Sequence, residues 1–220
     1  MKPRYWTRAT AELAARDPLM KQLINQHRTL TVGSRGDAFQ TLARAIVGQQ
    51  ISVKAAQSVW ERFAAAHSEV TPAAIVASSI DALRGCGLSG QKAGYILDLA
   101  AHFHDGRLRP DEWKRMKDED LVAVLVQVKC IGRWTAEMFL IFNLARPNVF
   151  PVGDLGVVNA IAKHYNRGRK PTLARMQKLG ASWAPWRSVA TWYLWRSLEV
   201  VPVNVPGGKT GKMSARVHQS

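Results

Sequence analysis

The amino-acid sequence predicts an all-α protein. Apolar residues recur at three- and four-residue spacing through most of the 220-residue chain, which is the pattern of helices that bury one face. No segment of useful length alternates apolar and polar residues as a half-buried strand does, and no tandem repeat is evident. Because 47% of the residues are hydrophobic, the chain can bury a core sufficient for independent folding.

Each helix is placed by its apolar spacing and by the residues that flank it. Ser52 is a typical N-cap for the helix that follows it, and Asp154 stands at the same position before another helix. Thr71 with Pro72 starts a short helix, and a glycine-rich turn over 85–90 precedes a longer one. In chain order, the predicted helices cover residues 37–47, 53–63, a short stretch from 72, 79–83, 91–103, 117–127, 134–144, 155–165 and 187–198.

The composition is strongly basic and indicates a polyanionic partner. The chain has 31 Lys and Arg against 16 Asp and Glu, a formal net charge of +15. Such an excess attracts nucleic acid or an anionic membrane. No apolar run is long enough to span a membrane, so nucleic acid is favoured. A basic ribosome-associated helical protein would have a similar charge and remains a distant alternative.

The two cysteines and the N-terminal sequence indicate the cellular compartment, and the C-terminal composition indicates where the domain ends. Two cysteines are too few for a disulfide framework or a four-cysteine iron–sulfur cluster. The N-terminus lacks the apolar core of a signal peptide, so we expect a cytoplasmic protein, associated with the bacterial nucleoid, or a nuclear one if eukaryotic. We predict one domain over 1–205 and a disordered basic tail over 206–220, which is rich in Gly, Lys and Ser.

A helix–hairpin–helix is predicted over about 121–144. The first helix stops at the short turn Lys129-Cys130-Ile131-Gly132, and a second helix begins at once with Arg133. The first backbone N–H groups of a helix have no intrahelical partner and carry partial positive charge, so they can bind a phosphate oxygen. Lys129 and Arg133 add charge beside them. The other interpretation is an ordinary hairpin between two packed helices.

Asp154 is the only acidic residue between Glu137 and Glu199, a stretch otherwise rich in Lys and Arg. A negative charge near DNA opposes binding, so the residue needs another reason to be there. One reason is capping of the following helix, worth about 1 kcal/mol. The other is electrostatic stabilisation of a cationic reaction intermediate, and the two roles are compatible.

Five motifs in the right order resemble the helix–hairpin–helix (HhH-GPD) DNA glycosylase superfamily, and within it the AlkA-type DNA-3-methyladenine glycosylase II. Together they span about residues 5 to 203. They read IVGQQIS at 46–52, GLSGQKA at 87–93, IGRWTAE at 131–137, FPVGDLG at 150–156, and PWRS with YLWR at 185–188 and 193–196. The resemblance implies two helical lobes with a DNA cleft between them and a catalytic loop over 147–156.

The resemblance also implies roles for individual residues. Asp154 matches the catalytic aspartate, and Gln50 matches the side chain that wedges into DNA where the base has flipped out. The base pocket is expected to contain Trp134, Met138, Trp183 and Trp186. The residues expected to contact DNA are Gln49, Gln50, Lys129, Cys130, Ile131, Gly132, Arg133 and Thr135. The alternative for Trp134 is packing in the core, and Trp192 and Trp195 are expected to be core residues.

The family hairpin usually holds a monovalent cation on backbone carbonyls, but no cofactor and no catalytic metal are expected, because no histidine is paired with a second ligand at metal spacing. Two departures refine the expectation. Lys129-Cys130 replaces the usual Pro-Gly, so the Cβ of Cys130 is expected to strain a turn suited to glycine. Trp134 stands where relatives with lyase activity carry lysine, and it has no amine to form a Schiff base.

The sequence therefore predicts a monomeric, monofunctional DNA glycosylase that removes alkylated purines from duplex DNA. Two alternatives stay open. The first is a non-catalytic DNA-binding module in which Asp154 is a cap and Trp134 a core residue. The second is a glycosylase for another lesion, such as an oxidised or deaminated base or a mismatched pyrimidine.

Overall fold

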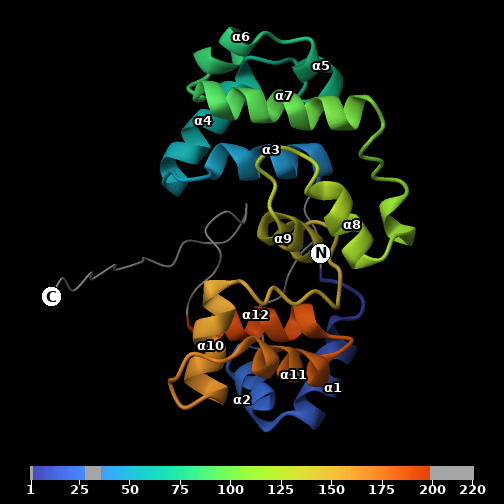
Figure 1. Ribbon diagram of the computed structural model, residues 1–220, viewed down its shortest axis with the longest axis vertical. Helices are drawn as coiled ribbons and strands as arrows, with labels where there is room; N and C mark the ends of the chain where they lie inside the picture. The colour runs from blue at the N-terminus through green and yellow to red at the C-terminus, as the bar shows by residue number, and fades with distance from the viewer. Residues whose placement is uncertain (1, 28–35, 199–220) are drawn as a thin grey trace, which may run out of the picture.

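The computed structural model describes residues 2–27 and 36–198. Within these ranges the chain forms twelve α-helices and one short 3-10 helix, with no strand, so the predicted all-α class is confirmed (Figure 1). The predicted domain end at 205 and the predicted disordered tail over 206–220 lie outside the described residues. No helix in the described ranges is both long enough and apolar enough to cross a lipid bilayer.

The lower lobe in Figure 1 is built around the last helix, α12. Every residue of α12 from Ser188 to Trp195 is buried, as expected for a helix enclosed by others on all sides. Around it pack α1 and α2 from the start of the chain and α10 and α11 from its second half. The bounds are α1 Trp6–Arg16, α2 Pro18–Gln26, α10 Leu155–Tyr165, α11 Leu173–Trp183 and α12 Arg187–Ser197.

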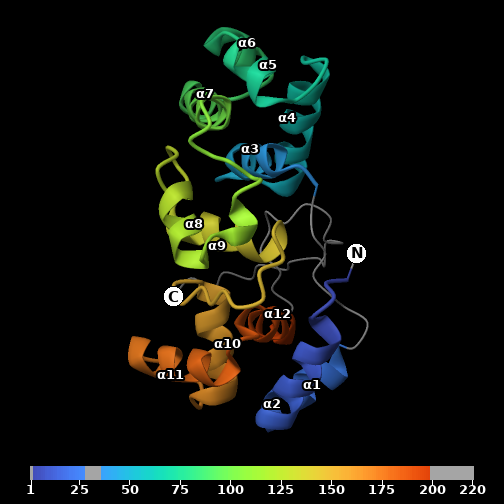
Figure 2. The same cartoon turned by 90° about the vertical axis from the view of Figure 1, so that its right-hand side faces the viewer.

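The upper lobe is centred on α7, which packs against α3, α5 and α6. The chain enters this lobe after α2 and returns to the lower lobe through α8 and α9, as Figure 2 shows from the side. The bounds are α3 Ala38–Gly48, α4 Val53–Ala65, α5 Pro72–Val76, α6 Ile80–Gly85, α7 Gly90–His104, the 3-10 helix η1 Trp113–Arg115, α8 Asp118–Leu125 and α9 Arg133–Phe142.

Helix α9 joins the two lobes. Its residues from Ala136 to Phe142 are all buried. On one side it packs against α3 of the upper lobe. On the other, the Phe142 ring stacks on Trp195 of α12, with 5.5 Å between the ring centroids. The two-lobed arrangement predicted from the sequence is therefore confirmed, and the first turn of α9 lies where the lobes meet.

The structure adds three helices that the sequence analysis did not assign: α1, α2 and α11. Two of these helices begin with N-cap residues of the usual type. The Asp17 side chain accepts hydrogen bonds from Leu19 N at 2.9 Å and Met20 N at 3.1 Å, and Pro18 occupies the first position of α2. Thr172 caps α11 in the same way, through Arg175 N at 3.2 Å.

Candidate functional site

Asp154 caps α10, as its position in the sequence predicted. Its backbone is extended, and its Oδ1 accepts a hydrogen bond from Val157 N at 2.8 Å. The side chain is buried at 7% exposure, although it carries the only carboxylate in a long basic stretch. Partial positive charge at the N-terminus of α10 stabilises a negative charge at this position.

Two tryptophan indoles hold the same carboxylate. Trp134, in the first turn of α9, donates from Nε1 to Asp154 Oδ2 at 2.7 Å. Trp195, on α12, donates from Nε1 to Asp154 Oδ1, also at 2.7 Å. Asp154 therefore receives three N–H donors from three different helices, and these fix the plane of its carboxylate.

The role of Trp195 was missed by the sequence analysis, which placed it in the core. It is indeed fully buried and stacked on Phe142. Its ring edge nevertheless faces Asp154, and Gly156 makes room for this contact. A Cβ at Gly156 would lie 2.9 Å from Trp195 Cδ1 and 3.1 Å from Asp154 Oδ1. A side chain at Gly156 is therefore incompatible with the present position of the indole.

The loop that precedes Asp154 contacts α12 through Val149 and α11 through Phe150. Ser188 Oγ of α12 accepts from Val149 N at 2.9 Å and is itself buried. The Phe150 ring packs directly over Gly180 of α11, where an added Cβ would approach the ring to 2.6 Å. The loop that presents Asp154 is thus anchored on the lower lobe.

The surroundings of the carboxylate combine aromatic and aliphatic surface. Trp134 is 41% exposed although it is held at Nε1, so one face of its ring is available to a ligand. Met138, one turn further along α9, is buried behind it. Leu155, which follows Asp154, is 71% exposed and was not singled out from the sequence. An accessible aromatic face beside a negative charge suits a flat, cationic ligand.

The hairpin between α8 and α9 has the expected turn and ends in an uncapped helix. Gly132 is the N-cap residue of α9 and has no side chain with which to cap it. Ile131 is buried, so its side chain belongs to the core. Cys130 has a φ of 65°, in the left-handed region that favours glycine, which confirms the strain expected from the replacement of Gly. Thr135 is half-buried in the first turn of α9.

The hairpin is tied to the upper lobe through its backbone. Lys129 N donates to Asp98 Oδ2 of α7 at 2.8 Å, and Lys129 Nζ lies 3.7 Å from Asp98 Oδ1. Gln49 Nε2 donates to Cys130 O at 3.3 Å. The hairpin and the end of α3 therefore form one connected surface.

The end of α3 is itself fixed by a lysine. Lys92 Nζ of α7 donates to Val47 O and to Gln49 O, both at 2.7 Å, and burial lowers the pKa of Lys92. Gln50 follows with a φ of 57° and an exposed side chain. This geometry suits the predicted wedge, because Gln50 projects from a turn whose preceding residues are held by Lys92 and Cys130.

Arg133, which was expected to contact DNA, also forms ion pairs within the protein. Its guanidinium is bound by two carboxylates, with Nη2 2.6 Å from Glu119 Oε1 and Nε 3.0 Å from Glu137 Oε1. Burial raises the pKa of Glu137, and Arg133 opposes that shift. Arg133 therefore links α8 to α9, and much of its charge is already neutralised. Both hairpin cations are exposed, and Lys129 lies 3.7 Å from a single carboxylate, that of Asp98.

Trp183 and Trp186, which were expected in the base pocket, both bind carboxylates at the start of the chain. Trp183 is buried, and its Nε1 donates to Asp17 Oδ2 at 3.0 Å. Trp186 is buried and donates to Glu12 Oε2 at 2.8 Å. Their polar edges are directed toward the α1–α2 region, so the two indoles help to hold the lower lobe together, and their place in a base pocket stays a prediction.

The carbonyl oxygens of the hairpin are the candidate ligands of the monovalent cation that the resemblance implies. The carbonyl oxygens of Val128 and Cys130 already accept one hydrogen bond each, from Ile131 N at 3.1 Å and from Gln49 Nε2. A carbonyl oxygen has two lone pairs, so both can also coordinate a cation. The hairpin backbone therefore has carbonyl lone pairs that could hold such an ion. In the ranges 2–27 and 36–198, no three His, Cys, Asp or Glu side chains gather as a metal site.

Comparison with known proteins agrees with this geometry. The family model described as "HhH-GPD superfamily base excision DNA repair protein" matches residues 43–185. The chain is 30% identical over 207 residues to DNA-3-methyladenine glycosylase 1 of Schizosaccharomyces pombe, covering 91% of each protein. It is 34% identical over 169 residues to a putative DNA-3-methyladenine glycosylase of Bacillus subtilis, and this match spans 59% of that relative's length.

Solved structures show the same likeness. The chain resembles the DNA-3-methyladenine glycosidase of Bacillus halodurans with 31% identity and a TM-score of 0.80, covering 86% of this chain and 88% of that one. It also resembles the S. pombe 3-methyladenine DNA glycosylase in complex with abasic DNA, with 30% identity and a TM-score of 0.69, covering 88% and 97%. The chain belongs to the HhH-GPD superfamily of base excision DNA repair proteins.

Proposed function

We propose that this protein is a monofunctional DNA glycosylase that removes alkylated purines from duplex DNA. The observation that carries the proposal is Asp154, a buried carboxylate held by the indoles of Trp134 and Trp195 beside an exposed aromatic face. The names of the relatives, which are DNA-3-methyladenine glycosylases, support the choice of substrate.

The first step is extrusion of the damaged nucleotide, since a base stacked in the duplex cannot reach a buried carboxylate. Flipping costs a few kcal/mol. Phosphate contacts at the uncapped start of α9 and at Lys129 offset this cost in a salt-dependent way. Gln50 fills the gap left in the stack. The flipped base then stacks on Trp134, which contributes about 0.5–2 kcal/mol for a cationic ring.

The second step is cleavage of the bond between the sugar C1′ and the base nitrogen. An alkylated purine carries positive charge, so the bonding electron pair leaves with the base and neutralises it. The sugar becomes an oxocarbenium-like cation, which the Asp154 carboxylate stabilises. Water then adds to C1′ and releases a proton, leaving an abasic site. Loss of one preorganised electrostatic partner costs about 3–4 kcal/mol by analogy with oxyanion holes.

The proposal includes no lyase step. Trp134 occupies the position of the lyase lysine and its only polar atom is engaged with Asp154. We therefore expect base release without strand cleavage, and no covalent enzyme–DNA adduct when borohydride is added. The active species is proposed to be the monomer.

Asp154→Asn tests the proposal. The amide keeps the shape of the side chain, and its oxygen can still accept from Val157 N and Trp195 Nε1, but it removes the charge. We expect DNA affinity to be retained and release of 3-methyladenine from methylated DNA to fall by at least about a hundredfold. Asp111→Asn, an exposed aspartate remote in sequence from the site, is the matched control. Undiminished release by Asp154→Asn would refute the assignment.

A panel of lesion oligonucleotides separates the remaining possibilities. Release of an oxidised or deaminated base with no release of alkylated purines would replace the substrate and keep the mechanism. Binding of every duplex without release of any base would favour a non-catalytic DNA-binding module.

A further inference from the structure

A cluster of positive charge lies on the lower lobe, outside the site described above. It is formed by the connection between α10 and α11 and by the start of α11, and we call it the basic flank. Its residues are Arg167, Arg169, Lys170, Arg175 and Lys178, all of which are exposed. The sequence has no Asp or Glu from residue 155 to residue 198, so no acid within this stretch balances this charge.

The cations of the basic flank are also unengaged. Arginines elsewhere bind carboxylates, as Arg109 does with Glu112 at 3.0 Å and Arg133 with Glu119. Among the residues that the structure describes, the side chains of the basic flank form no ion pair or hydrogen bond. Five free cations repel one another, and this repulsion is relieved when an anion binds.

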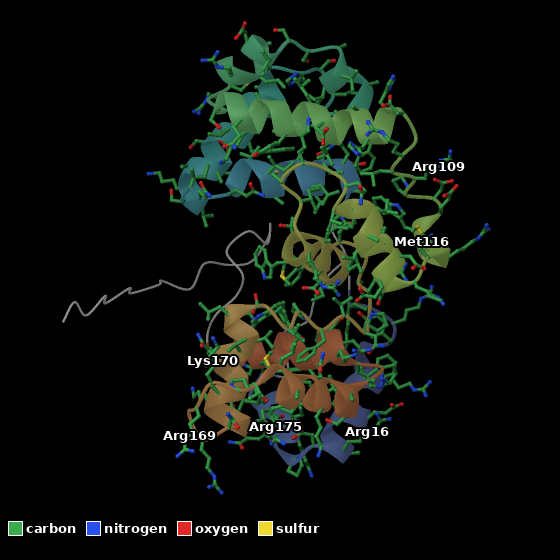
Figure 3. The ribbon with its side chains drawn as sticks, viewed as in Figure 1. Arg16, Arg109, Met116, Arg169, Lys170 and Arg175 are labelled. Carbon is green, nitrogen blue, oxygen red and sulfur yellow. The ribbon has the colours of Figure 1, made fainter. Side chains whose placement is uncertain are left out.

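The basic flank lies on the same side of the molecule as the candidate active site. In Figure 1, α10, its connection to α11 and the turn from α3 to α4 all lie on the left. Figure 3 shows Arg169 and Lys170 on that side of the lower lobe, with Arg175 beside them. Helix α10 begins after Asp154 and ends at Tyr165. Its 11 residues span about 16 Å, which corresponds to about five base pairs of duplex.

We infer that the basic flank binds the phosphate backbone of the same duplex, about half a helical turn from the lesion. This inference rests on the proposed function, because it takes the damaged nucleotide to lie at Asp154. An acidic protein is the less suitable partner. Lysine is depleted in protein interfaces, and Leu173 is the only large apolar side chain that α11 exposes among the described residues.

The test compares two triple variants that lose the same charge. Arg169→Gln/Lys170→Gln/Arg175→Gln removes three cations from the basic flank, and their backbone hydrogen bonds are unaffected by the change of side chain. Lys114→Gln/Arg115→Gln/Lys117→Gln removes three exposed cations from the segment around Met116, on the right in Figure 3. Circular dichroism and thermal melting check that both variants fold.

The measurement is the dissociation constant for a duplex with a central abasic site, determined as a function of KCl concentration. Each phosphate contact contributes about 0.9 to the slope of log K against log salt. We expect the slope of the basic-flank variant to fall by about 2 to 3 and that of the control variant to stay at the wild-type value. Cutting the duplex to about four base pairs on one side of the lesion should abolish the difference.

The outcomes separate this inference from the proposed function. An equal loss in both variants would mean that net charge alone matters and would overturn it. A wild-type slope for the basic-flank variant would also overturn the inference that the flank binds DNA. It would favour an acidic protein as the partner. Base release by the wild-type enzyme is scored separately, on methylated DNA. Its absence would refute the glycosylase while leaving the slopes on abasic DNA unchanged.

Discussion

Replacing Gly156 with alanine would place a methyl group against the hydrogen bond between Trp195 and Asp154. The new Cβ would lie 2.9 Å from Trp195 Cδ1 and 3.2 Å from Trp195 Nε1, closer than real side chains pack. Trp195 has no free space into which it can retreat, because it is fully buried and stacked on Phe142. The indole or the carboxylate must therefore move, and their contact at 2.7 Å is lost or lengthened.

The expected effect can be estimated from two opposing contributions. A hydrogen bond to a charged group contributes about 1.5–3 kcal/mol, and overpacking a core costs about 1–3 kcal/mol. Against this, Gly→Ala in a helix gains up to about 1 kcal/mol. We expect a modest loss of stability. If the carboxylate loses its orientation, the loss of about 1.5–3 kcal/mol from the transition state lowers the rate by roughly 10- to 150-fold.

The assay is single-turnover release of 3-methyladenine at saturating enzyme, combined with thermal melting. Gly94→Ala in α7 is the matched control, because an added Cβ there meets nothing within 4 Å and reports helix propensity alone. Trp195→Phe removes the same donor without adding volume and should slow release similarly. If Gly156→Ala releases base at the wild-type rate and melts no lower than Gly94→Ala, the indole of Trp195 does not position Asp154.

Four further predictions concern Trp134 and the hairpin between α8 and α9. Trp134→Phe, which removes the donor to Asp154 and keeps an aromatic face, should slow base release more than it weakens DNA binding, measured by single-turnover kinetics and anisotropy. Cys130→Gly should raise the melting temperature by a few degrees, since a left-handed conformation costs an L-residue about 1–2 kcal/mol. Burial raises the pKa of the Cys130 thiol, so iodoacetamide should label it more slowly than free cysteine at pH 7.5 and faster as the pH rises. Asp98→Ala should weaken DNA binding tenfold or more by releasing Lys129 N, while Asp98→Asn should retain most of the affinity.

Local signals predicted the parts of the site that depend on neighbouring residues. The cap at Asp154 was visible from the chain, because a capping bond joins residues three apart. The hairpin could be predicted as well, because its turn and the two flanking helices are contiguous in the sequence. The strain at Cys130 followed from one substitution in a turn that favours glycine. The missed helix α2 carried an equally clear signal in Asp17 followed by Pro18, so it could have been predicted.

The contact of Trp195 with Asp154 and that of Trp183 with Asp17 join segments that are distant in the sequence. Nothing in the spacing of Trp183 or Trp195 tells which carboxylate each indole will meet. Trp195 reaches Asp154 across 41 residues, whereas Trp183 reaches Asp17 across 166. Arg133 pairs with Glu119 of α8 and with Glu137 of α9. The second pair has the i,i+4 spacing of a helix and could have been predicted, whereas the first joins two helices. The contact of Arg133 with phosphate stays a prediction.

The way in which Asp154 is held bears directly on its chemistry. A carboxylate beside Arg or Lys would be fixed by a neutralising charge, and a developing cation would then compete with that partner. Among the described residues Asp154 forms no ion pair, and its three donors are neutral N–H groups of Val157, Trp134 and Trp195. Neutral dipoles orient the carboxylate while leaving its full negative charge available. A transition state with positive charge on the sugar therefore meets a preorganised anion that needs little reorganisation, which is the condition for strong electrostatic catalysis.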